Sequence, residues 1–195
     1  FKADNLVTKN APKAKYQLRN MKNIKDKKQA KMLKKLELTN NEMKLLCQYS
    51  KKKKIKFLLS PFDIDGVKLI KSLKLKYIKI PSGEITNLPL LQEIARNKFK
   101  IFMSTGMANN KEISQALNVL TKLGTKKNNI FLLHCNTEYP TPYEDVNLNV
   151  LKSFKSNFNI KVGYSDHTIG DHISIGAISM GAEVIEKHIT LDKNF

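Results

Sequence analysis

Two histidines near the end of the printed sequence have the spacing of a candidate metal pair. His167 follows the apolar run Lys161–Asp166, and His188 lies inside the next such run, Glu183–Thr190. Residues two apart on a strand share a face, which places Ser165 beside His167. Consecutive runs joined by one short helix are expected to be neighbouring strands, about 4.8 Å apart. Two imidazoles could then hold a divalent ion, with water and substrate oxygens completing its coordination. The competing interpretation of each histidine is a hydrogen-bonded core residue.

Alternation also assigns faces to the neighbours of these histidines. Glu186 and His188 are two residues apart and point the same way, whereas Asp166 points away from Ser165 and His167. Asp166 is therefore expected to orient neighbouring groups rather than to bind metal.

A set of serines and one lysine predicts an anion site. Lys79 ends an apolar run between Ile78 and Ile80, where a solvated surface lysine is not expected. Small hydroxyls beside exposed backbone N–H groups can hold phosphate or carboxylate oxygens. The competing use of such a lysine is a Schiff base, and the serines favour anion binding. The serines at the ends of runs, each near Gly or Pro, are Ser60, Ser82, Ser104 and Ser165.

These residues are positioned by six β-rich runs that alternate with helical patterns. Polar residues stand at or directly after the end of all six runs, which turn formation alone does not explain. Strand and helix in alternation predict βαβ units and a parallel sheet, which can be doubly wound or a (β/α)₈ barrel. No G-x-G-x-x-G or G-x-x-x-x-G-K-[ST] pattern supports nucleotide binding. The runs are Lys56–Ser60, Lys76–Ile80, Lys100–Thr105, Ile130–Cys135, Lys161–Asp166 and Glu183–Thr190.

The helical patterns between the runs have recognisable ends. In the clearest, 109–123, Asn109 or Asn110 is expected to cap the start and Gly124 to follow the end. The first 38 residues are rich in lysine and weakly periodic, which predicts a long loop or an irregular helical insertion. The other helical patterns are 38–50, 65–73, 88–96 and 171–180.

Composition and charge limit the classes of protein to which this sequence can belong. The formal net charge of +18 invites a nucleic-acid-binding interpretation, but only Arg19 and Arg96 are arginine, the residue that reads bases and phosphates best. We therefore interpret the lysines as mainly solvated surface and keep a Lys-rich nucleic-acid-binding module as the rival from another class. No apolar run approaches the roughly 20 residues of a membrane span. Cys47 and Cys135 are far apart, which favours reduced thiols and a cytoplasmic protein.

The run ends, taken in order, resemble the sialic acid synthase family, whose bacterial members include N-acetylneuraminate synthases. The matching stretches are "SPFD", "KIPSGE", "STGM", "LLHCNTEYPTPYEDVNL", "GYSDHT" and "EKHITLDK", and the opening "FKADNLVTKNAPKAKYQ" resembles the segment after the family's second barrel strand. The resemblance spans essentially the whole sequence. It implies a TIM barrel, of which about strands 3 to 8 are present in residues 1–195, with 1–38 as the segment after strand 2.

The resemblance also implies roles for particular residues. His167 and His188 match metal ligands, with manganese expected ahead of magnesium or cobalt. Glu84 matches an acidic residue tied to catalysis, together with Lys79, and Tyr139 matches a sugar contact. Asn136 and Thr137 remain alternatives at one position of the family pattern. The implied phosphoenolpyruvate contacts are Ser60, Lys79, Ser82, Ser104, Asn136, Thr137 and Ser165.

The implied reaction joins phosphoenolpyruvate to N-acetylmannosamine and yields N-acetylneuraminate and phosphate. The alternative within this chemistry is another hexosamine, giving legionaminic or pseudaminic acid. The family's first two strands and its small C-terminal antifreeze-like domain, which completes the partner's site in a domain-swapped homodimer, are absent from this sequence. The isolated 195 residues are therefore expected to be inactive and the full-length parent active, with no membrane or specific nucleic-acid partner.

Overall fold

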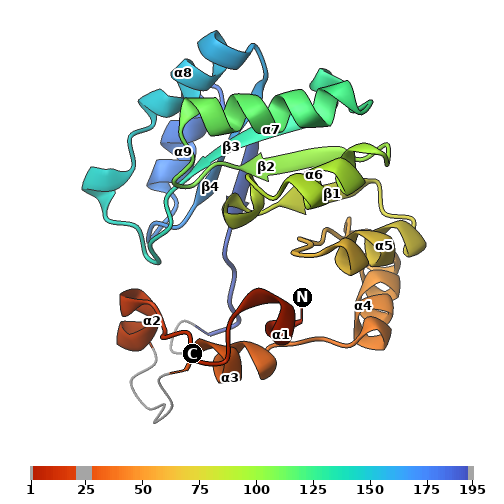
Figure 1. Ribbon diagram of the computed structural model, residues 1–195. Coiled ribbons are helices and arrows are strands. Elements are labelled where there is room, and N and C mark those ends of the chain that lie inside the picture. The colour runs from red at the N-terminus through yellow and green to blue at the C-terminus, as the bar shows by residue number, and fades with distance from the viewer. Residues whose placement is uncertain (1, 21–27, 193–195) are drawn as a thin grey trace. The chain divides into compact units, whose positions relative to one another are not determined.

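The computed structural model describes residues 2–20 and 28–192. Parts of the predicted 1–38 segment, and Lys193 of the "EKHITLDK" stretch, lie outside these residues. The chain divides into two compact units, Phe1–Leu75 and Lys76–Phe195 (Figure 1).

The regular elements described in the first unit are all helices, beside one isolated antiparallel bridge between Pro12 and Lys28. Helix α4 begins with a capping box, in which Glu42 N donates to Thr39 Oγ1 at 3.2 Å and Thr39 N donates to Glu42 Oε2 at 2.6 Å. Helix α5 begins where Gly66 N donates to the Asp63 carboxylate at 2.7 Å, so the aspartate of "SPFD" is a helix cap. The helices are α1 (Ala3–Leu6), α2 (Lys15–Asn20), α3 (Gln29–Lys34), α4 (Asn40–Lys52) and α5 (Ile64–Ser72).

The prediction of a strand at Lys56–Ser60 is wrong for the described chain. The segment has no regular secondary structure, and it joins no ladder of the sheet. A strand requires backbone hydrogen bonds to a neighbour, which a β-rich composition by itself does not provide. The sheet therefore has five strands among the described residues, where six runs were expected.

The second unit is built on a parallel sheet whose strands follow one another in chain order (Figure 1). A doubly wound sheet reverses its strand order at a switch point, whereas here each strand is added to the same edge, as in a barrel. The ranges of Ile130–Cys135 and Lys161–Asp166 agree with the sequence prediction. The strands are β1 (Tyr77–Ile80), β2 (Lys100–Ser104), β3 (Ile130–Cys135), β4 (Lys161–Asp166) and β5 (Val184–Lys187).

Helices and short turns connect these strands. Asn109 caps α7 by accepting from Lys111 N and Glu112 N, and Gly124 follows the helix at a φ of 109°, both as predicted. Helix α8 was not predicted. The elements are η1 (Ser82–Glu84), α6 (Leu88–Ala95), α7 (Asn110–Lys122), η2 (Lys127–Asn129), η3 (Tyr143–Asp145), α8 (Asn149–Phe158) and α9 (His172–Ser179).

The two faces of the sheet have different compositions. Ile78 and Ile80 of β1 are fully buried on one face, and Lys79 between them points to the other, as the alternation predicts. On the second face, Gly163 of β4 permits close approach: a Cβ there would lie 2.6 Å from the Val184 carbonyl oxygen. The buried apolar face packs against helices that contribute Leu90, Leu91, Ile94, Ile113, Leu117, Leu120, Leu151 and Phe154.

Within the described residues, no helix combines the length and apolar character needed to cross a bilayer. Both cysteines, Cys47 and Cys135, are free and buried.

Candidate functional site

Lys79 connects three strands of the sheet through a polar cluster that is buried at Lys79 and partly exposed at Glu186. Its ammonium donates to Ser104 Oγ at 2.7 Å and lies 3.1 Å from Glu186 Oε1. Ser165 Oγ donates to the same Glu186 oxygen at 2.7 Å. Only 8% of the Lys79 side chain is exposed, so its charge lies at a largely desolvated position. The structure thus brings together three residues predicted for the anion site: Lys79, Ser104 and Ser165.

Glu186 was given no role in the sequence analysis, although it occupies the centre of this cluster. Its carboxylate forms an ion pair with Lys79 and accepts a hydrogen bond from Ser165, the two groups that were assigned to an anionic ligand. The signal that could have identified it is its position two residues before His188 on β5, where both side chains point the same way. Its partner Lys79 is more than a hundred residues away in sequence, which local patterns do not reveal.

His167 is held in one orientation by contacts from the segment that follows β3. Its Nδ1 lies 2.7 Å from the Asn136 carbonyl oxygen, and a carbonyl can only accept, so Nδ1 carries the proton. The Nε2 atom lies 3.4 Å from Ser165 Oγ. Burial lowers the pKa of His167, and the nearby His188 lowers it further, although the Asn136 carbonyl acts in the opposite direction. The neutral ring therefore presents the Nε2 lone pair, the usual arrangement of a metal-binding histidine.

His188 lies beside His167, as predicted from the two neighbouring strands. The ring centroids are 5.6 Å apart, and the Tyr139 ring lies 4.1 Å from His167 and 5.5 Å from His188. A cavity of about 190 Å³ is lined by Ser165, His167, Glu186, Lys187 and His188.

The donor set at this cavity fits a divalent ion in part. Two imidazoles suit a transition metal, and the hydrogen bond from His167 Nδ1 to a carbonyl is the support that such ligands generally have. No group of three His, Cys, Asp or Glu side chains within residues 2–20 and 28–192 is placed to hold a metal. His167 and His188 would therefore share the ion with water or substrate oxygens.

The segments that follow β1, β2 and β3 approach one another near Ser82. Gly106 has a φ of 49°, and a Cβ there would lie 2.6 Å from Ser82 Cβ and 3.2 Å from Thr137 Cγ2. Glycine is required at this position by both the backbone angle and the lack of space. Ser82 and Thr137, both predicted contacts of the anionic ligand, are thereby brought to one place.

Three other predicted residues make different contacts. Asn136 Nδ2 donates to the Asp145 carbonyl at 2.8 Å, and its buried Oδ1 has no hydrogen-bond partner. The Glu84 carboxylate accepts from Asn87 Nδ2 at 2.7 Å, just before α6. Ser60 is exposed and lies in the first unit.

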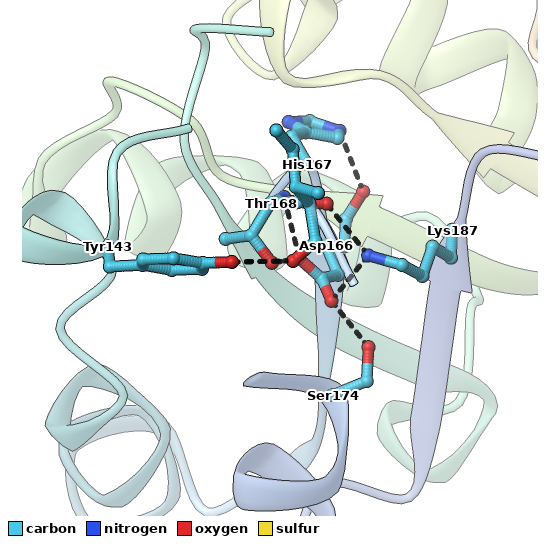
Figure 2. A network of polar contacts seen from close by, with 8 residues as sticks. Tyr143, Asp166, His167, Thr168, Ser174 and Lys187 are labelled. Atoms are coloured by element: carbon cyan, nitrogen blue, oxygen red, sulfur yellow. Dashed lines mark hydrogen bonds and ion pairs between the residues drawn. The ribbon is translucent and has the colours of Figure 1, made fainter. Parts of the chain in front are cut away.

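Asp166 faces away from the cavity, as predicted, and receives several donors (Figure 2). Burial acts to raise the pKa of its carboxyl group, but bonds from Lys187, Ser174 and Thr168 outweigh burial and hold that pKa below its usual value. The carboxylate is therefore charged at neutral pH.

His134 is a structural histidine whose titration predicts that the stability of the fold depends on pH. Its Nε2 donates to the Val146 carbonyl at 2.7 Å. Burial lowers the pKa of His134, against a smaller opposing effect of the Val146 carbonyl. Below pH 6.5, the ordinary value, the unfolded chain binds this proton more readily than the folded chain, so stability falls as pH falls.

We expect His134→Gln, which can still donate to the Val146 carbonyl, to remove the part of the pH dependence of stability that His134 causes. The slope that it removes is at most about 1.4 kcal/mol of unfolding free energy per pH unit. Urea unfolding between about pH 7.5 and pH 5.5 measures the slope. His172→Gln, at an exposed position, is the matched control, and identical slopes in the wild type and His134→Gln would contradict the prediction.

Comparisons with known proteins match the whole chain to one family. A model described as the NeuB family matches residues 1–195. The chain is 55% identical over 194 residues to N,N'-diacetyllegionaminic acid synthase of Campylobacter jejuni, covering 100% of this chain and 58% of that protein. It is 41% identical over 196 residues to the protein of the same name from Legionella pneumophila, covering 100% of this chain and 54% of that protein. The chain thus spans little more than half the length of these relatives.

A solved structure has the same fold. The crystal structure of N-acetylneuraminic acid (sialic acid) synthetase from Leptospira borgpetersenii, in complex with citrate, superimposes with a TM-score of 0.81 at 34% identity. The match covers 89% of this chain and 60% of that chain. With the sequential parallel sheet, this match identifies the fold as an incomplete α/β barrel.

Proposed function

We propose, since this chain belongs to the NeuB family, that the protein condenses phosphoenolpyruvate with an N-acetylated hexosamine to give a nine-carbon sugar acid and phosphate. The observation that carries the proposal is the desolvated Lys79 ammonium, grouped with Ser104 and Ser165 at strand ends beside the imidazoles of His167 and His188. A cation with hydroxyl donors suits an anionic donor substrate, and the histidine pair suits a divalent ion at the acceptor.

The proposed chemistry balances without a redox partner. The methylene carbon of phosphoenolpyruvate forms a bond to the aldehyde carbon of the open-chain sugar, and water adds to the adjacent carbon of the donor. The adduct then expels phosphate by C–O cleavage. A divalent ion, when bound, supplies Lewis-acid polarisation of the aldehyde oxygen.

The residues of this chain would orient the two substrates. Lys79, with the hydroxyls of Ser104 and Ser165, would hold the anionic donor, and the preset His167 ring would avoid reorientation during reaction. Tyr139, whose ring lies tilted against that of His167, is the candidate sugar contact, and Glu84 is the candidate for moving a proton.

Similarity to the two legionaminic acid synthases favours the alternative hexosamine over N-acetylmannosamine. The name N,N'-diacetyllegionaminic acid specifies two acetylated nitrogens in the product. The corresponding acceptor is a hexose with two acetamido groups, whereas N-acetylmannosamine has one. We therefore propose the diacetamido hexose as the preferred acceptor and N-acetylmannosamine as the second candidate.

A product analysis tests both parts of the proposal. The product of the complete reading frame is incubated with phosphoenolpyruvate, Mn²⁺ and one of the two acceptors, and phosphate release and product mass are measured. We expect phosphate release with both acceptors and a higher kcat/KM with the diacetamido hexose. Sugar consumption without phosphate release would instead indicate a metal-dependent aldolase, and a preference for N-acetylmannosamine would reverse the acceptor assignment.

A further inference from the structure

A buried network lies behind the two histidines, on the opposite face of the sheet. Asp166 ends β4, and none of its side chain is exposed. Its Oδ1 accepts from Thr168 N at 2.8 Å and Thr168 Oγ1 at 2.7 Å, and its Oδ2 accepts from Ser174 Oγ at 2.5 Å and Lys187 Nζ at 2.8 Å. Figure 2 shows these donors converging on the carboxylate from the segment after β4, from α9 and from β5.

The ion pair of this network joins the residues that immediately precede the two histidines. Asp166 and Lys187 are partners in the register of β4 and β5, and His167 and His188 follow them in sequence. The pair therefore connects the two strands at the point where both imidazoles leave the sheet. A shift of either strand end would change the separation of the rings, which is 5.6 Å between centroids.

The same pair also determines the path of the chain after His167. Thr168 is bound at its N–H and hydroxyl by Asp166, and Lys187 Nζ donates to the Thr168 carbonyl at 3.0 Å. On the other side, Thr141 N donates to the His167 carbonyl at 2.9 Å. The backbone at His167 is consequently held on both sides.

General stability is a weak explanation for this arrangement. Asp166 is fully buried and 29% of the Lys187 side chain is exposed. Taking a charge out of water offsets much of the attraction within such a pair, so the pair adds little net stability, whereas it can impose one specific geometry. The same strands carry a second pair at their other end, between Lys161 and Glu183, at 4.0 Å and with 44% and 48% of the side chains exposed. The exposed pair serves as the control, because it lies at the opposite end of the strands from the histidines and should not affect their separation.

We propose that Asp166 and Lys187 form a positioning pair that sets the separation of His167 and His188, and thereby the affinity of the site for a divalent ion. The inference rests on the proposed function, in which the two imidazoles hold that ion.

The test compares two double variants of the product of the complete reading frame. Asp166→Asn/Lys187→Met removes both charges of the pair at nearly constant volume, and Lys161→Met/Glu183→Gln does the same at the exposed pair. Mn²⁺ affinity is measured by isothermal titration, Tm by calorimetry, and kcat at saturating Mn²⁺. We expect the first variant to lose about 10- to 100-fold in Mn²⁺ affinity, as for loss of groups that support metal ligands, while the control keeps wild-type affinity.

The outcomes separate this inference from the proposed function. A folded Asp166→Asn/Lys187→Met variant with wild-type Mn²⁺ affinity overturns the inference alone, whereas a wild-type protein that does not bind Mn²⁺ overturns the metal assignment and the inference with it. A raised Mn²⁺ requirement with kcat retained at saturation supports positioning. Should the double variant not fold, Thr168→Val, which removes one hydroxyl donor to Asp166, decides: a loss of about threefold or more supports the pair, and unchanged affinity overturns it.

Discussion

Replacing Lys79 by methionine is expected to reduce kcat/KM for phosphoenolpyruvate by about 100- to 1,000-fold, the usual cost of losing a preorganised electrostatic group. Methionine keeps most of the length of the side chain but removes the ammonium, which contacts Ser104 and Glu186. Only 8% of the Lys79 side chain is exposed. An anionic donor would then meet the Glu186 carboxylate without a neutralising cation. The measurement is phosphate release as a function of phosphoenolpyruvate concentration.

A second variant distinguishes anion binding from simple charge balance. If Lys79 served only to neutralise Glu186, Lys79→Met/Glu186→Gln would recover activity, whereas we expect the double variant to remain as impaired as the single one. Lys100→Met, at the exposed first position of β2, is the control and should retain wild-type kinetics. Recovery in the double variant would remove Lys79 from the anion site.

Loss of either imidazole of the pair is expected to have a comparably large effect. His167→Ala and His188→Ala should each lower Mn²⁺ affinity by more than about 100-fold and reduce turnover accordingly, because each would remove one of the two imidazoles proposed to hold the ion. Mn²⁺ titration followed by phosphate release at saturating substrates checks both effects.

The control for the histidine variants is His172→Ala, an exposed residue on α9 whose ring packs against Tyr143. It should keep the Mn²⁺ affinity of the wild type. The effect of His167→Ala should also exceed that of the Asp166→Asn/Lys187→Met variant, since a ligand is lost rather than displaced. Equal losses in the two would contradict the division between ligand and positioning residue.

Local sequence signals predicted the strand ends well where they depend on alternation. The range Lys161–Asp166 agrees with β4, and the assignment of Ser165 and His167 to one face and Asp166 to the other is confirmed by their contacts. The period of two along a strand makes such faces readable from a few residues. The histidine pair follows from the same rule, with the added assumption that consecutive strands are neighbours.

Features that depend on contacts with distant parts of the chain were harder to predict from the sequence. Lys56–Ser60 has the composition of a strand but joins no described ladder, and α8 at Asn149–Phe158 was not recognised. Asn136 was predicted as a ligand contact, and its side-chain amide instead donates to the Asp145 carbonyl, while its backbone carbonyl holds His167. Whether Asn136 also contacts the substrate stays a prediction.

The sequence by itself determined the alternation of strand and helix, the residues at the strand ends and the likeness to one family, because these depend on local periodicity and short motifs. Only the tertiary structure decided the strand order that distinguishes a barrel from a doubly wound sheet. It also decided that Glu186 joins Lys79 to Ser165, and that Asp166 pairs with Lys187 behind the histidines. These contacts join residues on different strands, and their geometry depends on register and packing, which no short stretch of sequence encodes.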